Sequence, residues 1–140
     1  MATLSACTLS IEKIPSDASS VKVTVKYTLT PSSREKQLGT GFNSSMQLLG
    51  DDGGPTPELR STINDGFFVV DNSTTSVTRS QTRTLSKTVL NEDPETNAQG
   101  AEFIDEVFAK AVVSYGGNTP TPPPAIIPAT SEIQRGAWTV

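Results

Sequence analysis

One stretch of ten residues constrains the fold more strongly than any other part of the chain. From Val21 to Thr30, apolar side chains at the odd positions alternate with Lys and Thr side chains at the even positions. Successive side chains of a β-strand point to opposite faces, so this alternation places every apolar group on one face. We therefore predict a strand with one buried face and one face in water.

The residues before this stretch also favour strands and turns. Residues 2–14 are rich in strand-forming side chains, but their apolar positions change parity between Leu4 and Leu9. Such a change predicts a β-bulge or a switch of the strand between two sheets. Residues 15–17, Pro-Ser-Asp, are typical of a turn, and they predict that the two strands are joined there.

Two further strands are predicted after the polar stretch at residues 31–36. The first ends at Gly50, where the sequence of residues 51–55 breaks it, and it is lined by apolar residues of one parity, Leu38, Phe42, Met46 and Leu48. The second is a short apolar strand, Phe67–Val70. It lies between the turn-like sequences of residues 64–66 and 71–72.

An unusual run of hydroxyl side chains follows. Between residues 76 and 90, Ser and Thr hold one parity without interruption up to Thr88. The other parity mixes apolar residues with Arg, Gln and Lys. Helix propensity is low in such a run and its period is two, so we predict one long strand, or a strand bent across a sandwich edge. Because neither face is fully apolar, part of this strand is predicted to stand at a sheet edge.

The C-terminal part combines an ambiguous segment with a proline-rich one. Residues 101–115 carry apolar side chains at both helical and strand spacing, which leaves two interpretations open. The first, favoured by Asp93-Pro94 as a helix start, is a short helix or turn near residues 94–104 followed by a strand. The second is a single helix of about three turns packed on a sheet. The prolines of residues 116–128 exclude a central strand there, and residues 131–140 again have strand-forming content.

These elements together predict a mainly β fold. About six or seven strands with turn-rich connections are typical of an immunoglobulin-like or related antiparallel β-sandwich, here with one short helix near residues 94–104. Hydrophobic residues make up only 34% of the chain, which agrees with many turns and exposed strand faces. We predict that residues 1–118 form the sandwich, and that residues 119–140 form a proline-rich connector and a C-terminal strand or arm of the same domain.

The composition argues against several classes of chemistry. The chain has no His and one Cys, which removes Ser-His and Cys-His nucleophiles and zinc clusters. A glycosidase cleft is usually lined by aromatic side chains, and this chain has one Trp and two Tyr. The sequence has no phosphate-binding glycine motif, its net charge of -4 disfavours nucleic acid, and no apolar run approaches the ~20 residues of a membrane span. We predict a non-enzymatic protein without a cofactor.

Acidic residues in predicted loops raise the question of a calcium site. The candidates are Asp51, Asp52, Asp65 and Asp93, since calcium takes oxygen ligands from flexible loops. None of these loops has the spacing of an EF-hand, and Asp is also favoured in turns because its carboxylate bonds the backbone. Turn chemistry is the simpler interpretation, so no metal site is predicted.

The hydroxyl-rich strand is the main candidate for binding a partner. Its Ser80, Thr82 and Thr84 admit three interpretations: a solvated face, a ladder of cross-strand hydroxyl pairs, or a surface on which another subunit adds a strand. The third gains support because no Lys or Pro of that parity blocks strand pairing.

Two other groups of residues extend this predicted surface. Arg79, Arg83 and Lys87 recur at four-residue intervals on the opposite parity, and such a basic stripe suits an acidic protein surface unless it is simply solvated. Ile133 and Trp138 belong to the predicted C-terminal arm, which could close the sheet or reach a neighbouring subunit.

Three segments of the chain resemble small all-β structural proteins of tailed-bacteriophage virions, of the capsid decoration or cement type. They are V-K-V-T-V-K-Y-T-L-T at 21–30, the hydroxyl strand at 76–88, and the proline-rich connector leading to E-I-Q-R-G-A-W-T-V at 132–140. The resemblance implies a non-enzymatic protein that oligomerises and clamps neighbouring shell subunits through strand edges and terminal arms. Its partners would then be copies of itself and a major shell protein, and its location the virion, assembled in the host cytoplasm.

Two alternatives to this role stay open. The first is a tail or head-tail connector component. The second is an immunoglobulin-like adhesion or ligand-binding module that uses the acidic loops. Thermal stabilisation by calcium would favour the second alternative.

Overall fold

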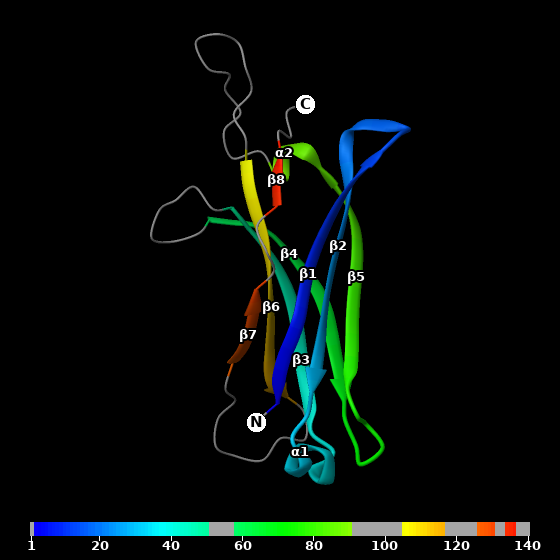
Figure 1. Ribbon diagram of the computed structural model, residues 1–140, viewed down its shortest axis with the longest axis vertical. Coiled ribbons are helices and arrows are strands. Elements are labelled where there is room, and N and C mark those ends of the chain that lie inside the picture. The colour runs from blue at the N-terminus through cyan, green and yellow to red at the C-terminus, as the bar shows by residue number, and fades with distance from the viewer. Residues whose placement is uncertain (1, 51–57, 91–104, 117–125, 131–133, 137–140) are drawn as a thin grey trace.

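The computed structural model describes residues 2–50, 58–90, 105–116, 126–130 and 134–136 (Figure 1). Within these residues the chain is built mainly from strands, which run along the long axis of the molecule. The elements in chain order are β1 (Thr3–Ile14), β2 (Asp17–Thr30), α1 (Ser33–Leu38), β3 (Gly41–Gly50), β4 (Glu58–Val69), β5 (Val77–Ser86), α2 (Lys87–Leu90), β6 (Asp105–Gly116), β7 (Ile126–Thr130) and β8 (Gln134–Gly136).

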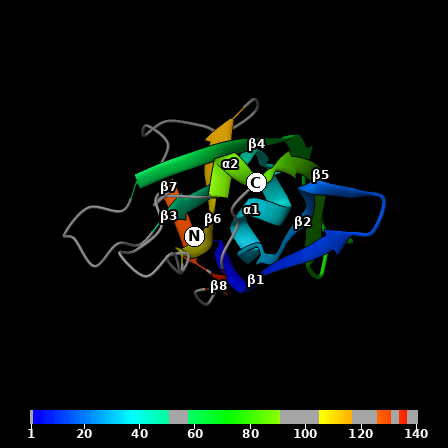
Figure 2. The ribbon, with the colours of Figure 1, turned by 90° about the horizontal axis from the view of Figure 1, so that it is seen from above.

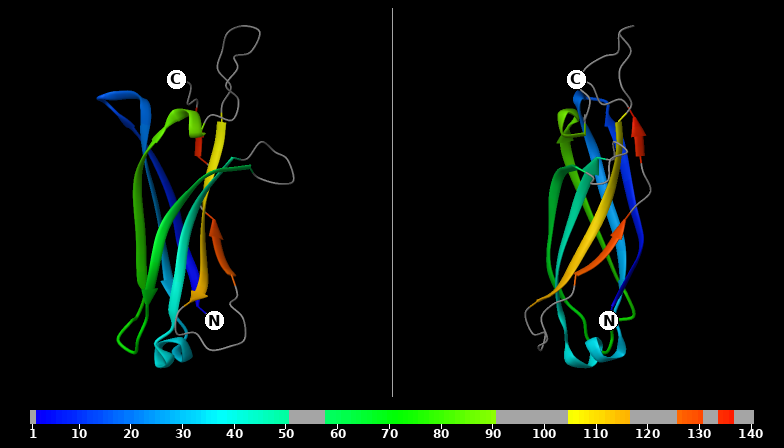
Figure 3. Two further views of the ribbon diagram at one scale, coloured as in Figure 1. Left: turned by 180° about the vertical axis from the view of Figure 1, so that it is seen from behind. Right: turned by 90° about the vertical axis from the view of Figure 1, so that its left-hand side faces the viewer.

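The strands form two antiparallel sheets that face each other. The first sheet has the order β1-β2-β5, and the second has the order β4-β3-β6-β7, with β8 also paired to β6. The view along the strands separates β1 and β2 from β3 and β4 (Figure 2). The helix α1 lies at the end of the sandwich where β1 begins (Figure 3). This arrangement confirms the predicted β-sandwich.

The core lies between the two sheets and is lined by one face of each long strand. The alternation in residues 21–29 is confirmed, because the odd side chains of β2 are buried and the even ones are not. Opposite them, β3 contributes Phe42, Met46 and Leu48, and the odd residues of β6 from Val107 to Val113 are fully buried. Each large apolar side chain removed from water in this way stabilises the fold by roughly 1.5–3 kcal/mol.

The β-bulge predicted in the first strand is present. The register of β1 on β2 shifts between Ser5 and Thr8, and Ala6 has a positive φ of 52°. The shift restores Leu9 to the inner face, where it is buried. The parity change in the sequence therefore marks a true irregularity of the strand.

The prediction that Leu38 begins a strand is wrong, because the polar stretch before it forms the helix α1. Ser32 accepts a hydrogen bond from the Glu35 amide and the Glu35 carboxylate accepts one from the Ser32 amide, which is a capping box. Gly39 ends the helix with a left-handed φ of 63°. Leu38 is consequently 45% exposed, and the strand begins at Gly41.

The prediction of a turn at residues 64–66 followed by a short strand is also wrong. These residues belong to the continuous strand β4, which carries a bulge there because Ser44 pairs with Gly66 and Ser45 with Asn64. Asp65 is the extra residue, and Gly66 adopts a φ of 89° that suits glycine. The turn-like sequence is therefore used inside a strand.

Two C-terminal predictions are confirmed: a strand follows residue 104, and Pro128 does not lie in a central strand. Residues 105–116 form β6, so the strand interpretation holds for this part, while the helix expected near residues 94–104 lies outside the described residues. β7 contains Pro128 and stands at the end of the sheet order, as a proline-bearing strand requires. The boundary expected at residue 118 also lies outside the described part of the chain.

Candidate interaction surface

The outer face of the first sheet carries many Ser and Thr side chains. On β5 the exposed side chains include Thr78, Ser80, Thr82 and Thr84, and the register sets them beside the outward Thr and Lys residues of β2. Two cross-strand contacts join these hydroxyls, with Oγ1–Oγ1 distances of 3.0 Å for Thr24 and Thr82 and 3.3 Å for Thr28 and Thr78. The predicted solvated face and hydroxyl ladder are therefore both present on one surface.

The strand β5 ends the order of this sheet. Among the described residues its one strand neighbour is β2, and the ladder between them runs from Ser20–Ser86 to Leu29–Val77 without a register shift. Figure 1 shows β5 on the outer side of β2. The prediction that this strand stands at an edge is correct, although it ends at Ser86 and the following residues form α2.

The geometry of the ladder shows which backbone groups of β5 face the open edge. Hydroxyls that touch across two strands are typical of the narrow pairs, in which the two residues exchange no backbone hydrogen bonds. Since the pair type repeats at every second residue, Ser80 and Thr84 are in the same class as Thr82. From this pair type we infer that their N–H and C=O groups point away from β2. In agreement, the Thr82 carbonyl oxygen accepts a hydrogen bond from Arg83 Nη1 at 2.9 Å.

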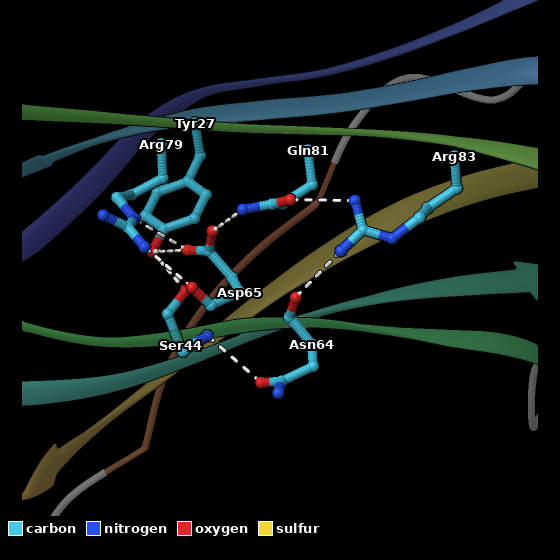
Figure 4. Close-up of polar contacts among 8 residues, drawn as sticks. Tyr27, Ser44, Asn64, Asp65, Arg79, Gln81 and Arg83 are labelled. Atoms are coloured by element: carbon cyan, nitrogen blue, oxygen red, sulfur yellow. Dashed lines mark hydrogen bonds and ion pairs between the residues drawn. The ribbon is translucent and has the colours of Figure 1, made fainter.

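The inner face of β5 carries a polar cluster that joins the two sheets (Figure 4). Its centre is Asp65 at the bulge of β4, whose side chain is fully buried. Arg79 Nε donates to Asp65 Oδ2 at 2.9 Å, Arg79 Nη2 donates to the Asp65 carbonyl at 2.7 Å, and Gln81 Nε2 donates to Asp65 Oδ1 at 2.7 Å. Arg83 extends the cluster by donating to Gln81 Oε1 at 2.9 Å. The bulge thus turns a carboxylate toward β5.

The cluster also reaches the middle of both sheets. Tyr27 of β2 is fully buried, and its hydroxyl lies 2.5 Å from Ser44 Oγ and 3.5 Å from Asp65 Oδ2. The guanidinium of Arg79 lies over the Phe68 ring, 4.8 Å from the ring centroid, which adds a cation–π contact. Every strand from β2 to β5 therefore contributes to the cluster.

Burial and hydrogen bonding act in opposite directions on the acidic groups of this cluster. Burial raises the pKa of the Asp65 carboxyl, but the bonds from Arg79 and Gln81 and the Arg79 charge outweigh burial and leave that pKa below its usual value. Burial likewise raises the pKa of Tyr27 to about 12. The cluster consequently holds an ionised carboxylate and a neutral phenol at neutral pH.

A second buried carboxylate, Glu35, closes the end of the sandwich. It accepts hydrogen bonds from the Ser32 amide at 2.7 Å, from the Ala2 amide at 3.1 Å and from the Tyr115 hydroxyl. Burial raises the pKa of Glu35, yet these hydrogen bonds outweigh burial and lower it overall. Glu35 therefore ties α1, the start of β1 and the end of β6 together.

The predicted binding residues are distributed differently from the expectation. Ser80, Thr82 and Thr84 lie together on the outer face, as predicted. Of the basic stripe, Arg79 and Arg83 contact the inter-sheet cluster and Lys87 begins α2, while their binding to a partner stays a prediction. They share the parity of Val77 and Leu85, which pack against the core, so this side of the strand faces inward.

Several predicted residues lie outside the described part of the chain. These are Asp51, Asp52, Asp93, Ile133 and Trp138. Asp65, the remaining calcium candidate, is in a strand and binds Arg79, so its carboxylate is already occupied. Across the described residues no group of three or more acidic or thiol side chains is placed to hold a metal ion. No helix in the same part of the chain is long and apolar enough to cross a membrane.

The central residues of the cluster, Tyr27, Ser44 and Asp65, were not predicted from the sequence. One signal pointed to Tyr27, because a phenol within an apolar strand face needs a partner for its hydroxyl. The Arg and Gln residues beside Val77 and Leu85 gave a second signal, since polar groups on an inward face also need partners. Nothing in the sequence identified Asp65 as that partner.

Comparison with known proteins gives the fold and no more. No known protein family matches the sequence, and no curated protein matches it significantly. Among solved structures, the chain is similar to the solution structure of a plant protein assigned to the late embryogenesis abundant (LEA) class. The two share 12% sequence identity with a TM-score of 0.50, over 98% of this chain and 71% of the other.

Proposed function

We propose that this chain is a non-enzymatic structural protein that assembles with other protein subunits through the edge of β5 and the hydroxyl face beside it. The edge of β5 carries this proposal. Three alternate residues of that strand, Ser80, Thr82 and Thr84, direct their backbone N–H and C=O groups toward the edge, as the contact between Thr24 and Thr82 indicates. Such an edge is the usual place where another chain adds a strand.

The polar cluster supports the proposal because it makes the edge rigid. An edge strand with one neighbour frays easily. The hydrogen bonds that Arg79 and Gln81 donate to the buried Asp65 also hold the inner face of β5 in place. A partner strand would therefore meet a surface that is already ordered. Because β5 is already ordered in the folded chain, binding does not have to offset the conformational entropy lost when the strand becomes ordered.

The setting that we propose for this assembly is the shell of a tailed-bacteriophage virion, where the protein would act as a decoration or cement subunit. This part of the proposal rests on the resemblance of three sequence segments. A shell presents many equivalent sites, so an oligomer that carries several copies of the hydroxyl face would gain avidity on the shell that it lacks on a single subunit. The location would be the virion surface.

Cosedimentation with shells tests the function. The purified chain is mixed with assembled shells of the encoding virus that lack it, and separately with the isolated shell protein. We expect T84K to weaken shell binding, because a Lys beside the edge opposes strand addition. The matched control T62K places the same charge on the exposed outer face of β4 and should leave binding unchanged. Equal binding of wild type to shells and isolated subunits, or equal loss in both variants, would contradict the proposal.

A further inference from the structure

We infer that the partner at the β5 edge is a second copy of this chain, and that two β5 strands pair antiparallel about a twofold axis at Thr82. The inference rests on the proposed function and identifies the partner subunit at the β5 edge. It would join two three-stranded sheets into one continuous sheet with the order β1-β2-β5-β5-β2-β1. The evidence is the self-complementarity of the strand.

The backbone limits the possible registers. Ser80, Thr82 and Thr84 direct their N–H and C=O groups toward the edge, whereas the residues between them bond β2. A second copy can therefore pair only if its own hydroxyl residues stand opposite these. In an antiparallel pair with twofold symmetry, that condition places the axis on a residue and not between two residues.

Repulsion between arginines excludes the registers in which the twofold axis would lie on Arg79, Gln81 or Arg83. An axis at Gln81 would set Arg79 opposite Arg83 of the second copy, and an axis at either arginine would set that arginine opposite itself. Like charges directly opposite on paired strands are destabilising. The axis must consequently fall on a hydroxyl residue.

An axis at Thr82 sets compatible side chains opposite each other in the middle of the strand. Ser80 then stands opposite Thr84 of the second copy, which continues the hydroxyl ladder already formed by β2 and β5. On the inner face, Arg83 stands opposite Gln81 of the second copy, the residue type that it already contacts at 2.9 Å. An axis at Ser80 would use a shorter part of Val77–Ser86. The pairing would form roughly six backbone hydrogen bonds, two for each wide pair.

One contact in the single chain competes with this pairing. Arg83 Nη1 donates to the Thr82 carbonyl, which is one of the groups that the second copy would use. A carbonyl oxygen has two lone pairs, so the guanidinium can share it or move to Gln81 of the second copy. Arg83 thus occupies one hydrogen-bond acceptor of the open edge in the monomer.

Sedimentation equilibrium tests the dimer with the full chain. We expect reversible dimerisation of wild type, and a dissociation constant raised about thirtyfold or more in T82P, which lacks the central N–H and two hydrogen bonds. T82A keeps the N–H and should dimerise like wild type. A monomeric wild type at the highest soluble concentration, or an unchanged dissociation constant in folded T82P, would overturn the inference.

Cysteine cross-linking tests the register and stays informative if T82P fails to fold. In a C7S background, T82C should oxidise to a disulfide-linked dimer, because opposite Cα atoms of a wide pair lie ~5.5 Å apart. S80C alone should not cross-link, since residue 80 of one copy would lie ~14 Å from residue 80 of the other. A mixture of S80C and T84C should cross-link. Efficient cross-linking of S80C alone with none in T82C would refute this register.

The outcomes separate the two proposals. A monomeric wild type that binds shells and loses that binding in T84K would refute the dimer and leave the proposed function intact. A dimer with the predicted cross-links that does not bind shells would support the inference and argue against the function.

Discussion

The replacement of Arg79 by Met tests how the two sheets are joined at the β5 side. Met keeps an apolar stem of similar length but removes the guanidinium that bonds Asp65 Oδ2 at 2.9 Å and the Asp65 carbonyl at 2.7 Å. The Asp65 side chain is fully buried and the Arg79 side chain is 26% exposed. The variant therefore leaves a buried carboxylate without its counter-ion.

The expected loss of unfolding free energy is about 3.5–5 kcal/mol. Removal of one partner of a buried ion pair costs about 3–5 kcal/mol, and the partial exposure of Arg79 favours the lower half of this range because water can reach the vacated site. The lost contact with the Phe68 ring adds about 0.5–1 kcal/mol. Urea denaturation at pH 7 measures the sum, provided that the m-value is unchanged.

A matched variant and a pH series complete the test. R83M makes the same replacement on the same face, but Arg83 is exposed and bonds neutral groups, so its loss should stay below about 1 kcal/mol. In wild type the lowered pKa of Asp65 means that its stabilisation is present above the unfolded pKa and is lost as pH falls through the folded pKa. In R79M, burial dominates and raises that pKa, so the deficit should shrink at acid pH. A loss below about 1 kcal/mol for R79M, independent of pH, would refute the reasoning.

Three further predictions concern other parts of the sandwich. E35Q should lower stability by about 2 kcal/mol at pH 7 in urea denaturation, because three donors lose a charged acceptor, and the Ala2 amide should exchange faster; equal stability would contradict this. G41A should cost about 1–3 kcal/mol, since a Cβ would overlap the Phe67 ring and lie 2.9 Å from the Gly116 carbonyl oxygen, and F67A should recover the part due to the ring; no recovery would contradict a clash with the ring. Spectrophotometric titration should find Tyr27 and Tyr115 ionising at about 12 in the folded chain and near 10 in urea, so stability falls as pH rises from about 10 toward 12; ionisation near 10 in the folded chain would argue against burial.

The elements that the sequence predicted well are those that depend on local alternation. Val21–Thr30 lies within β2 and has the expected faces. The hydroxyl parity of residues 78–84 lies on the outer face of an edge strand. In each case the two-residue period is enough, because it decides which side chains share a face.

Features that depend on pairing across the sandwich could not be predicted in the same way. Asn64-Asp65-Gly66 reads as a turn, and only its register on β3 makes it a bulge that directs Asp65 to Arg79. The helix α1 was missed although its signals are local, since Ser32 and Glu35 have the spacing of a capping box and Gly39 follows. The polar composition of that stretch concealed them.

Hydrogen exchange of the β5 amides, measured in the single chain and in the assembled state, tests the central claim most directly. The amides of Ser80, Thr82 and Thr84 should exchange rapidly in the single chain, because they point to the open edge, whereas the Gln81 amide should be protected by β2. On assembly the three edge amides should become protected while Gln81 stays unchanged. Edge amides that remain fast in the assembled state would contradict an interface at β5.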